Sequence, residues 1–168
     1  ANVYGPKSGP WVDDACELLK VGMPALIDGG NANAGLVYVT NVVDVILAAL
    51  FTEKAKGRAY NACDELEVTW KEYFSELAQI VGAPKPRSIP RWVAQKGASV
   101  CETIWGKTKL QSRPLMTPEA LNLIGSHHRI PSKRAREELG IQEGVGYQDA
   151  MDAIRRYLIS EQPSANGR

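Results

Sequence analysis

Histidine and carboxylate pairs are the first residues in this sequence whose types and spacing suggest chemistry. His127 and His128 are adjacent, and adjacent residues of an extended strand point to opposite faces, so they cannot readily share one ligand. We interpret them as structural or exposed rather than as a metal site or a general acid. Asp13 and Asp14 diverge at a predicted helix start, where they favour the helix dipole instead of forming a catalytic pair.

The three cysteines, Cys16, Cys63 and Cys101, are far apart and odd in number. No CxxC pair and no Cys/His ligand spacing occurs, so the sequence supports neither a zinc site nor a disulfide framework. We therefore assign no metal ligand, and we expect buried free thiols in a reducing compartment.

The overall charge and hydropathy exclude several classes of partner. A net charge of +1 over 168 residues leaves no electrostatic footprint for nucleic acid. The densest basic run, Ser132–Arg136, is followed at once by two glutamates and is interpreted as a solvated helix face. No apolar run reaches the length of a membrane span, and the first residues lack the apolar core of a signal peptide. We expect a cytoplasmic protein with no nucleic-acid partner and no membrane span.

The segment Leu36–Phe51 is the element around which the chain is organised. Leu36–Val39 has β character and leads into Thr40 and Asn41, which are N-cap residue types. With Asn41 as the cap, Asp44 would stabilise the exposed N–H groups of the first turn. The helix that follows is apolar on nearly every face, so we expect it to be buried on nearly every face.

Other stretches predict further short elements around this unit. Thr69 and Glu72 form a capping box, and the helix behind it should bury Trp70, Phe74, Leu77 and Val81 before it stops at Gly82. The remaining expected helices are Trp11–Val21, Pro90 to about Trp105, Thr117–Gly125, Lys133–Leu139 with Ser132 as cap, and Tyr147–Ile159. One further strand is expected to end at Tyr4, and two others are expected at Ala25–Ile27 and Ala59–Ala62.

Strands this short cannot form a self-sufficient sheet. We interpret them as edge strands of a sheet whose other strands lie elsewhere. The opening Asn2–Tyr4, followed by a Gly-Pro turn, is typical of the end of a strand. We therefore expect residues 1–160 to be one part of a larger protein, with a disordered tail over residues 161–168.

Five landmarks occur in a recognisable order: NVYGP, VYVTNVVDVILAAL, GRAYNA, VTWKEYFSELAQIVG and SKRAREELG. Together they resemble the C-terminal half of an extended short-chain dehydrogenase/reductase, in the NAD-dependent epimerase/dehydratase superfamily. YVTNVVD is more similar to the 3β-hydroxysteroid dehydrogenase and sterol-carboxylate dehydrogenase branch than to the sugar epimerases. The resemblance covers roughly Asn2 to Ile159.

This resemblance implies an α/β fold, in which the chain is the mostly helical, substrate-binding part of an NAD(P)-binding Rossmann-like fold with a few short strands. It also implies an NAD or NADP cofactor and a Y-x-x-x-K pair whose tyrosine takes a proton from a substrate hydroxyl. The chain contains neither that pair nor a G-x-x-G-x-x-G turn. We therefore assign no catalytic residue and expect the cofactor to be bound mainly by another part of the protein.

The resemblance assigns binding roles to five residues. Asn2 matches a position just past the sixth strand, where an amide can contact substrate or cofactor, and Val3 and Tyr4 follow it. Trp11 lies in the segment that covers the substrate in the family, and Tyr38 in the central strand lies near it. The expected cofactor contacts are thus Asn2 and Val3, and the expected substrate contacts are Asn2, Tyr4, Trp11 and Tyr38.

The predicted function is a substrate-binding fragment of an NAD(P)-dependent oxidoreductase that acts on a hydroxy or keto group of a small molecule. One alternative is a non-catalytic NAD(P)-binding sensor or scaffold. A second is a nucleotide-sugar epimerase fragment, which Ala34 disfavours because such enzymes tend to carry an arginine there. A third is a self-contained helical interaction module. The apolar Leu36–Phe51 unit also predicts self-association, so a homo-oligomer is possible.

Overall fold

The computed structural model describes residues 1–96, 118–125 and 129–161. Helices dominate, and four short strands are present among the described residues. In chain order the elements are β1 (Asn2–Tyr4), a π-helical turn (Gly9–Asp13), α1 (Asp14–Lys20), β2 (Pro24–Ile27), a 3-10 turn (Asp28–Gly30), β3 (Leu36–Tyr38), α2 (Val39–Phe51), a second 3-10 turn (Glu53–Ala55), α3 (Trp70–Ile80), β4 (Arg87–Ile89), α5 (Pro118–Gly125), α6 (Lys133–Leu139) and α7 (Tyr147–Glu161).

The strands form two separate parallel pairs. β1 pairs with β3, with Asn2 opposite Leu36 and Tyr4 opposite Tyr38. β2 pairs with β4 through a register that shifts between Pro24 and Leu26. Helical crossovers connect the strands of each pair, as parallel pairing requires. The α/β class with a few short strands, predicted from the sequence, is confirmed.

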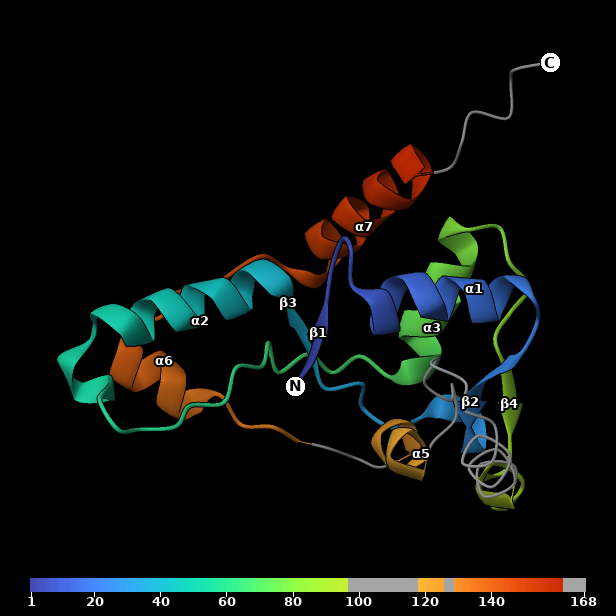
Figure 1. The fold of residues 1–168 in the computed structure, drawn as a ribbon, viewed down its shortest axis with the longest axis horizontal. Helices are drawn as coiled ribbons and strands as arrows, with labels where there is room; N and C mark the ends of the chain where they lie inside the picture. Colours follow the sequence, from blue (N-terminus) through green and yellow to red (C-terminus); the bar gives the residue numbers. More distant parts are fainter. Residues whose placement is uncertain (97–117, 126–128, 162–168) are drawn as a thin grey trace, which may run out of the picture.

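The main core lies where α1, α3 and α7 meet beside β1 and β3 (Figure 1). Its largest fully buried side chains are aromatic: Trp70, Tyr4 and Tyr73. The predicted start of α3 and the burial of Trp70, Phe74 and Leu77 are confirmed, whereas Val81 follows the helix and is only partly buried. The Thr69 hydroxyl accepts from the Glu72 N–H, and the Glu72 carboxylate accepts from the Thr69 N–H at 2.7 Å, which closes the capping box.

The predicted start of the central helix was wrong. α2 begins at Val39 with Tyr38 as its N-cap, and Asn41 makes no side-chain cap. The reason is that the N–H of Tyr38 donates to the carboxylate of Asp64, which supplies the cap from another segment. None of the residues of α2 is buried against the described part of the chain.

Several other predicted bounds also changed. Residues 59–62 run as a loop, whose Tyr60 and Asn61 side chains bond to Glu138 of α6 and to the Pro131 carbonyl. The first helix starts as a π-helical turn at Gly9, and α7 extends to Glu161, so the first residue of the tail predicted for residues 161–168 is helical; residues 162–168 lie outside the described residues. Residues 91–96 are helical; the predicted continuation to Trp105, like Cys101, His127 and His128, lies outside the described residues. Among the described helices, none is both long and apolar enough to cross a bilayer.

Candidate functional site

Asn2 and Tyr4 lie on the same face of β1 and turn toward the core. Asn2 is nearly buried, and its amide donates to the Ala34 carbonyl at 2.7 Å, which ties β1 to the residues before β3. It also lines a small hollow of about 220 Å³ together with Gly35 and Ile130. The Asn2 amide N–H therefore has a structural partner.

The aromatic residues predicted to contact substrate pack into the core. The Tyr4 ring meets the Tyr38 ring edge-on at 5.5 Å and the Tyr73 ring at 5.7 Å. Trp11 packs on Trp70 at 4.9 Å, and its carbonyl accepts from the Tyr73 hydroxyl. The structure thus brings Tyr4 and Tyr38 together, and Trp11 packs against the same cluster.

Val3 lies on the opposite face of β1 from Asn2 and Tyr4, because strand residues alternate. Its side chain is 38% exposed. Of the five predicted binding residues, Val3 is therefore the one that the described chain leaves most open to another molecule or another part of a protein.

A larger polar hollow lies between α2, α6, the segment 61–66 and the loop 141–146. We call it the Asp64 hollow; its volume is about 500 Å³. Its side chains that can donate or accept hydrogen bonds are Asn41, Asp44, Asn61, Cys63, Asp64, Ser132, Arg136, Gln142 and Glu143. None of them was predicted as a binding residue, since the hollow is built from segments far apart in sequence.

Asp64 is the central acceptor of this hollow. Its carboxylate accepts from the Tyr38 N–H at 2.8 Å and from the Asn41 amide at 3.0 Å. Asn41 also exchanges two hydrogen bonds with the backbone of Val145, so one amide holds α2, the Asp64 segment and the loop before α7 together. Burial raises the pKa of Asp64, although these donors oppose the shift.

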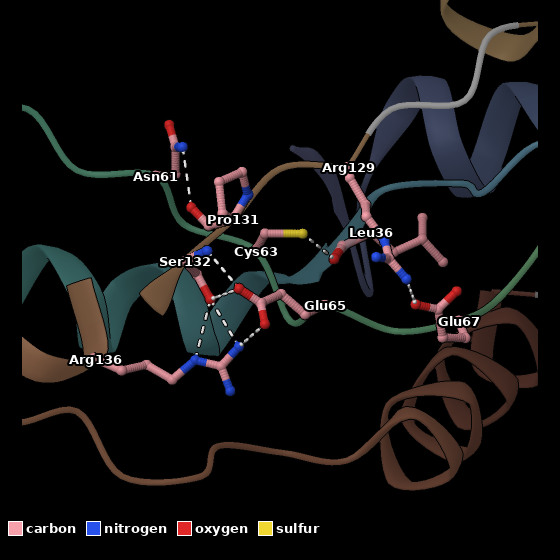
Figure 2. A network of polar contacts seen from close by, with 9 residues as sticks. All are labelled: Leu36, Asn61, Cys63, Glu65, Glu67, Arg129, Pro131, Ser132 and Arg136. Atoms are coloured by element: carbon pink, nitrogen blue, oxygen red, sulfur yellow. Dashed lines mark hydrogen bonds and ion pairs between the residues drawn. The ribbon is translucent and has the colours of Figure 1, made fainter. Parts of the chain in front are cut away.

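Glu65 forms the polar network beside the hollow (Figure 2). Its carboxylate accepts from the N–H and the hydroxyl of Ser132 and pairs with Arg136 at 2.6 Å. The backbone of Glu65 is left-handed, with φ of +53°, a conformation that costs a non-glycine residue on the order of 1 kcal/mol. The network offsets that cost. It also corrects the interpretation of the basic run as purely solvated, because Arg136 is bound here, and Ser132 caps no helix N–H.

Cys63 separates the Asp64 hollow from a second hollow of about 410 Å³ that is also lined by Glu65, Glu67, Arg129 and Lys133. The thiol donates weakly to the Leu36 carbonyl at 3.6 Å (Figure 2). Burial raises the pKa of Cys63, so the thiol form dominates and the sulfur is a poor nucleophile at neutral pH.

The side chains of the Asp64 hollow are suited to binding a polar ligand. Amide, hydroxyl, guanidinium and carboxylate groups can orient a polar ligand, but in residues 1–96, 118–125 and 129–161 no group of three His, Cys, Asp or Glu side chains could hold a metal ion. In the sequence, the residues that line the Asp64 hollow lie in the polar stretches NACDE and PSKRAR. Neither stretch indicates a site by itself, because the sequence does not show that the two lie close together.

Acid is expected to weaken the Glu65 network. The Ser132 N–H, chiefly, holds the pKa of Glu65 below its ordinary value. A lowered pKa means that this stabilisation is complete above the ordinary glutamate range and is lost as pH falls through the folded-state pKa. Glu65→Gln should therefore lower the urea midpoint at neutral pH and flatten its decline in acid. Glu67→Gln is the control, because its ion pair with Arg129 is largely exposed and screened. Equal acid sensitivity of the Glu65→Gln variant and the unmodified chain would contradict this.

Two curated relatives are similar to this chain. A 4-hydroxy-2-methyl-3-oxo-4-farnesyl-3,4-dihydroquinoline-1-oxide ketoreductase of Stigmatella aurantiaca is 27% identical over 132 residues, which are 77% of this chain and 39% of the relative. A 2-alkyl-3-oxoalkanoate reductase of Stenotrophomonas maltophilia is 22% identical over 158 residues, 91% of this chain and 48% of the relative. The chain thus spans less than half the length of either. No protein-family model matches it.

Solved structures share the fold at low identity. UDP-glucose 4-epimerase of Thermotoga maritima, solved with UDP-glucose, has a TM-score of 0.58 and 19% identity over 95% of this chain and 44% of its own. UDP-glucuronic acid 4-epimerase of Bacillus cereus, solved with UDP-glucuronic acid and NAD, has a TM-score of 0.59 and 19% identity over 95% of this chain and 43% of its own. This chain therefore has an α/β fold of the type found in NAD-dependent epimerases, and its curated relatives are reductases.

Proposed function

We propose that this chain is the substrate-binding part of an NAD(P)-dependent oxidoreductase of the extended short-chain type, acting on a hydroxy or keto group. One observation carries the proposal: a fold shared with NAD-dependent epimerases occurs in a chain whose two curated relatives are both named as reductases of oxo compounds. Both names also describe ketones attached to an apolar body. We therefore propose an apolar ketone or secondary alcohol as substrate, with 3β-hydroxysteroid dehydrogenase-like compounds in that class.

The cofactor is NAD or NADP, and its nicotinamide would supply or accept the hydride. This chain has no glycine-rich turn for the pyrophosphate and no Y-x-x-x-K pair, so its residues do not hold the cofactor or move the proton by themselves. We propose that Asn2 and exposed Val3 contact the ligands at the end of β1. Tyr4, Tyr38 and Trp11 would shape the substrate wall from behind, because they are packed into the aromatic core.

A nucleotide-sugar epimerase is the second candidate, because both named epimerase structures share the fold and were solved with UDP-sugars. Against it, Ala34 occupies the position where the family resemblance expects a diphosphate-binding arginine, and this alanine is buried. A sensor or scaffold that binds the cofactor without turnover is the third.

The test is an assay of the whole polypeptide encoded by the reading frame that contains this chain, with NADH and NADPH supplied separately. The substrates are a 2-alkyl-3-oxoalkanoate, a 3-keto steroid and UDP-glucose. We expect consumption of one reduced cofactor with a ketone, and none by residues 1–168 alone. Conversion of UDP-glucose without net cofactor consumption would identify an epimerase. Cofactor binding with no turnover of any substrate would favour the sensor.

A further inference from the structure

The small hollow beside Asn2 lies where separate segments of the chain meet. We call this space of about 220 Å³ the Asn2 hollow. The start of β1 and the residues before β3 form one part of its wall, and two partly buried aliphatic side chains form the rest, one from α5 and one from the segment before α6. Its lining residues are Ala1, Asn2, Asn33, Ala34, Gly35, Leu123 and Ile130. The hollow therefore adjoins a residue to which we assign ligand contacts.

Most polar side-chain atoms in this wall already have partners in the protein. The Asn2 amide nitrogen donates to the Ala34 carbonyl at 2.7 Å, and the Asn33 amide nitrogen donates to the Leu66 carbonyl at 2.8 Å. The side-chain oxygen of Asn33 accepts from the Gly35 N–H at 2.7 Å, which closes a local turn. None of the lining residues has a charged side chain. What the wall leaves for a ligand is therefore mainly aliphatic carbon.

A wall of this composition favours an alkyl group over a diphosphate. A diphosphate is negatively charged, and proteins bind it through cationic side chains or through several free N–H groups. The lining residues supply no Arg, Lys or His side chain. An alkyl group needs no such partner, and removing its surface from water is favourable in proportion to the area that is buried. The composition of the hollow thus selects an apolar part of a substrate.

Ile130 lies at the boundary between this hollow and a charged one. The neighbouring hollow of about 410 Å³ shares Asn33, Gly35 and Ile130 with the Asn2 hollow, and its charged lining residues are Glu65, Glu67, Arg129 and Lys133. The terminal methyl group of Ile130 lies over Gly35, 3.8 Å from the position that a Cβ would take there. Figure 2 shows Arg129 of the charged hollow with its guanidinium group bonded to Glu67. An alkyl group in the Asn2 hollow thus meets Ile130 before it reaches these charges.

We propose that the Asn2 hollow binds the alkyl body of the ketone and that Ile130 limits the length of the alkyl chain that fits. The inference rests on the proposed function and adds the specificity of that site. The keto group lies near Asn2, and the alkyl chain extends from it past Ala34 and Leu123 to Ile130. A chain that is one methylene too long has to displace Ile130 or enter the charged hollow, and both are unfavourable.

The test measures kcat/KM of the whole polypeptide for a series of unbranched methyl ketones that differ by single methylenes, with the reduced cofactor that it accepts. Ile130→Phe should lower kcat/KM for the preferred ketone by roughly tenfold or more, mainly through KM, because the ring takes space that the chain needs. Shorter ketones should keep their kcat/KM in this variant. Ile130→Ala should shift the preference to a longer ketone, because it opens the hollow toward its neighbour, and it is the second test if Ile130→Phe does not fold.

Ile80→Phe and Ile80→Ala are the matched controls. Ile80 is also partly buried, but it ends α3 and lines none of the three hollows. These two variants should therefore keep the chain-length profile of the unmodified polypeptide. Thermal midpoints of all four variants identify any that is not folded.

The possible outcomes separate this inference from the proposed function. Reduction of ketones with the same chain-length profile in both Ile130 variants would overturn the inference and leave the proposed function standing. Isothermal titration calorimetry with the same ketones, in the presence of the cofactor, covers the reverse case. Ketones that bind with a length profile set by Ile130 but are not reduced would refute the proposed function and support the hollow. Neither binding nor reduction would overturn both, and loss of UDP-glucose binding in Ile130→Phe alone would assign the hollow to a nucleotide sugar instead.

Discussion

Replacing Trp70 with alanine is expected to lower the free energy of unfolding by about 3–5 kcal/mol, the cost of removing a large aromatic side chain from a close-packed core. Trp70 is fully buried at the start of α3. Its ring packs on Trp11 at 4.9 Å and on Phe74 at 5.3 Å, so the cavity would be lined by rigid rings that cannot easily close it. Since domains are stable by only about 5–15 kcal/mol, this loss is a large share of the total.

Two further variants make the Trp70 prediction specific. Trp92→Ala is the matched control: Trp92 is 62% exposed and its ring meets Lys96 at 5.5 Å, so its loss should cost about 0.5–1 kcal/mol. Trp70→Phe should cost less than Trp70→Ala, because it keeps a ring and removes an indole N–H that has no partner among the described residues. The measurement is urea unfolding of residues 1–168 followed by circular dichroism. Similar losses for Trp70→Ala and Trp92→Ala would contradict the assigned core.

Elements whose signals are local could be predicted from the sequence. The capping box of α3 needs only Thr69 and Glu72, and the C-terminal glycines Gly22, Gly82 and Gly140 adopt the left-handed conformation that ends a helix. The start of α2 could not be predicted in this way, because its cap comes from Asp64, 26 residues further along the chain than Tyr38. The strand predicted at residues 59–62 failed for a similar reason: β propensity there is outweighed by side-chain contacts to α6.

The candidate site was predicted only in part. The resemblance led to the β1 and β3 residues, and the structure places Asn2, Tyr4 and Tyr38 close together. It could not lead to the Asp64 hollow or to the Glu65 network, since Glu65 and its partner Ser132 are 67 positions apart and meet only through the fold. The burial predicted for α2 is a different case: the apolar pattern was read correctly, but the described chain covers only one face of the helix.

Two fully buried tyrosines are expected to respond with opposite signs to the loss of their hydroxyl groups. Tyr73 donates its hydroxyl to the Trp11 carbonyl at 2.8 Å, so Tyr73→Phe should lower the free energy of unfolding by about 1 kcal/mol and leave that carbonyl without its donor. The Tyr4 hydroxyl has no partner among the described residues, so Tyr4→Phe should raise the free energy of unfolding by about 1 kcal/mol. Burial raises the pKa of both phenols well above the ordinary tyrosine range.

The same pair of variants separates a packing role of Tyr4 from direct substrate contact. An unpartnered buried hydroxyl destabilises the core, and a contact with substrate would give a reason to retain it. In the whole polypeptide, direct contact with the ketone would make Tyr4→Phe raise KM while the thermal midpoint rises; the packing role that we propose predicts the same rise in midpoint with KM unchanged. Tyr73→Phe should lower the midpoint and leave KM unchanged. If Tyr4→Phe raises the midpoint with no change in KM, Tyr4 supports the substrate wall by packing alone, and a lower midpoint would show that its hydroxyl has a partner in the complete protein.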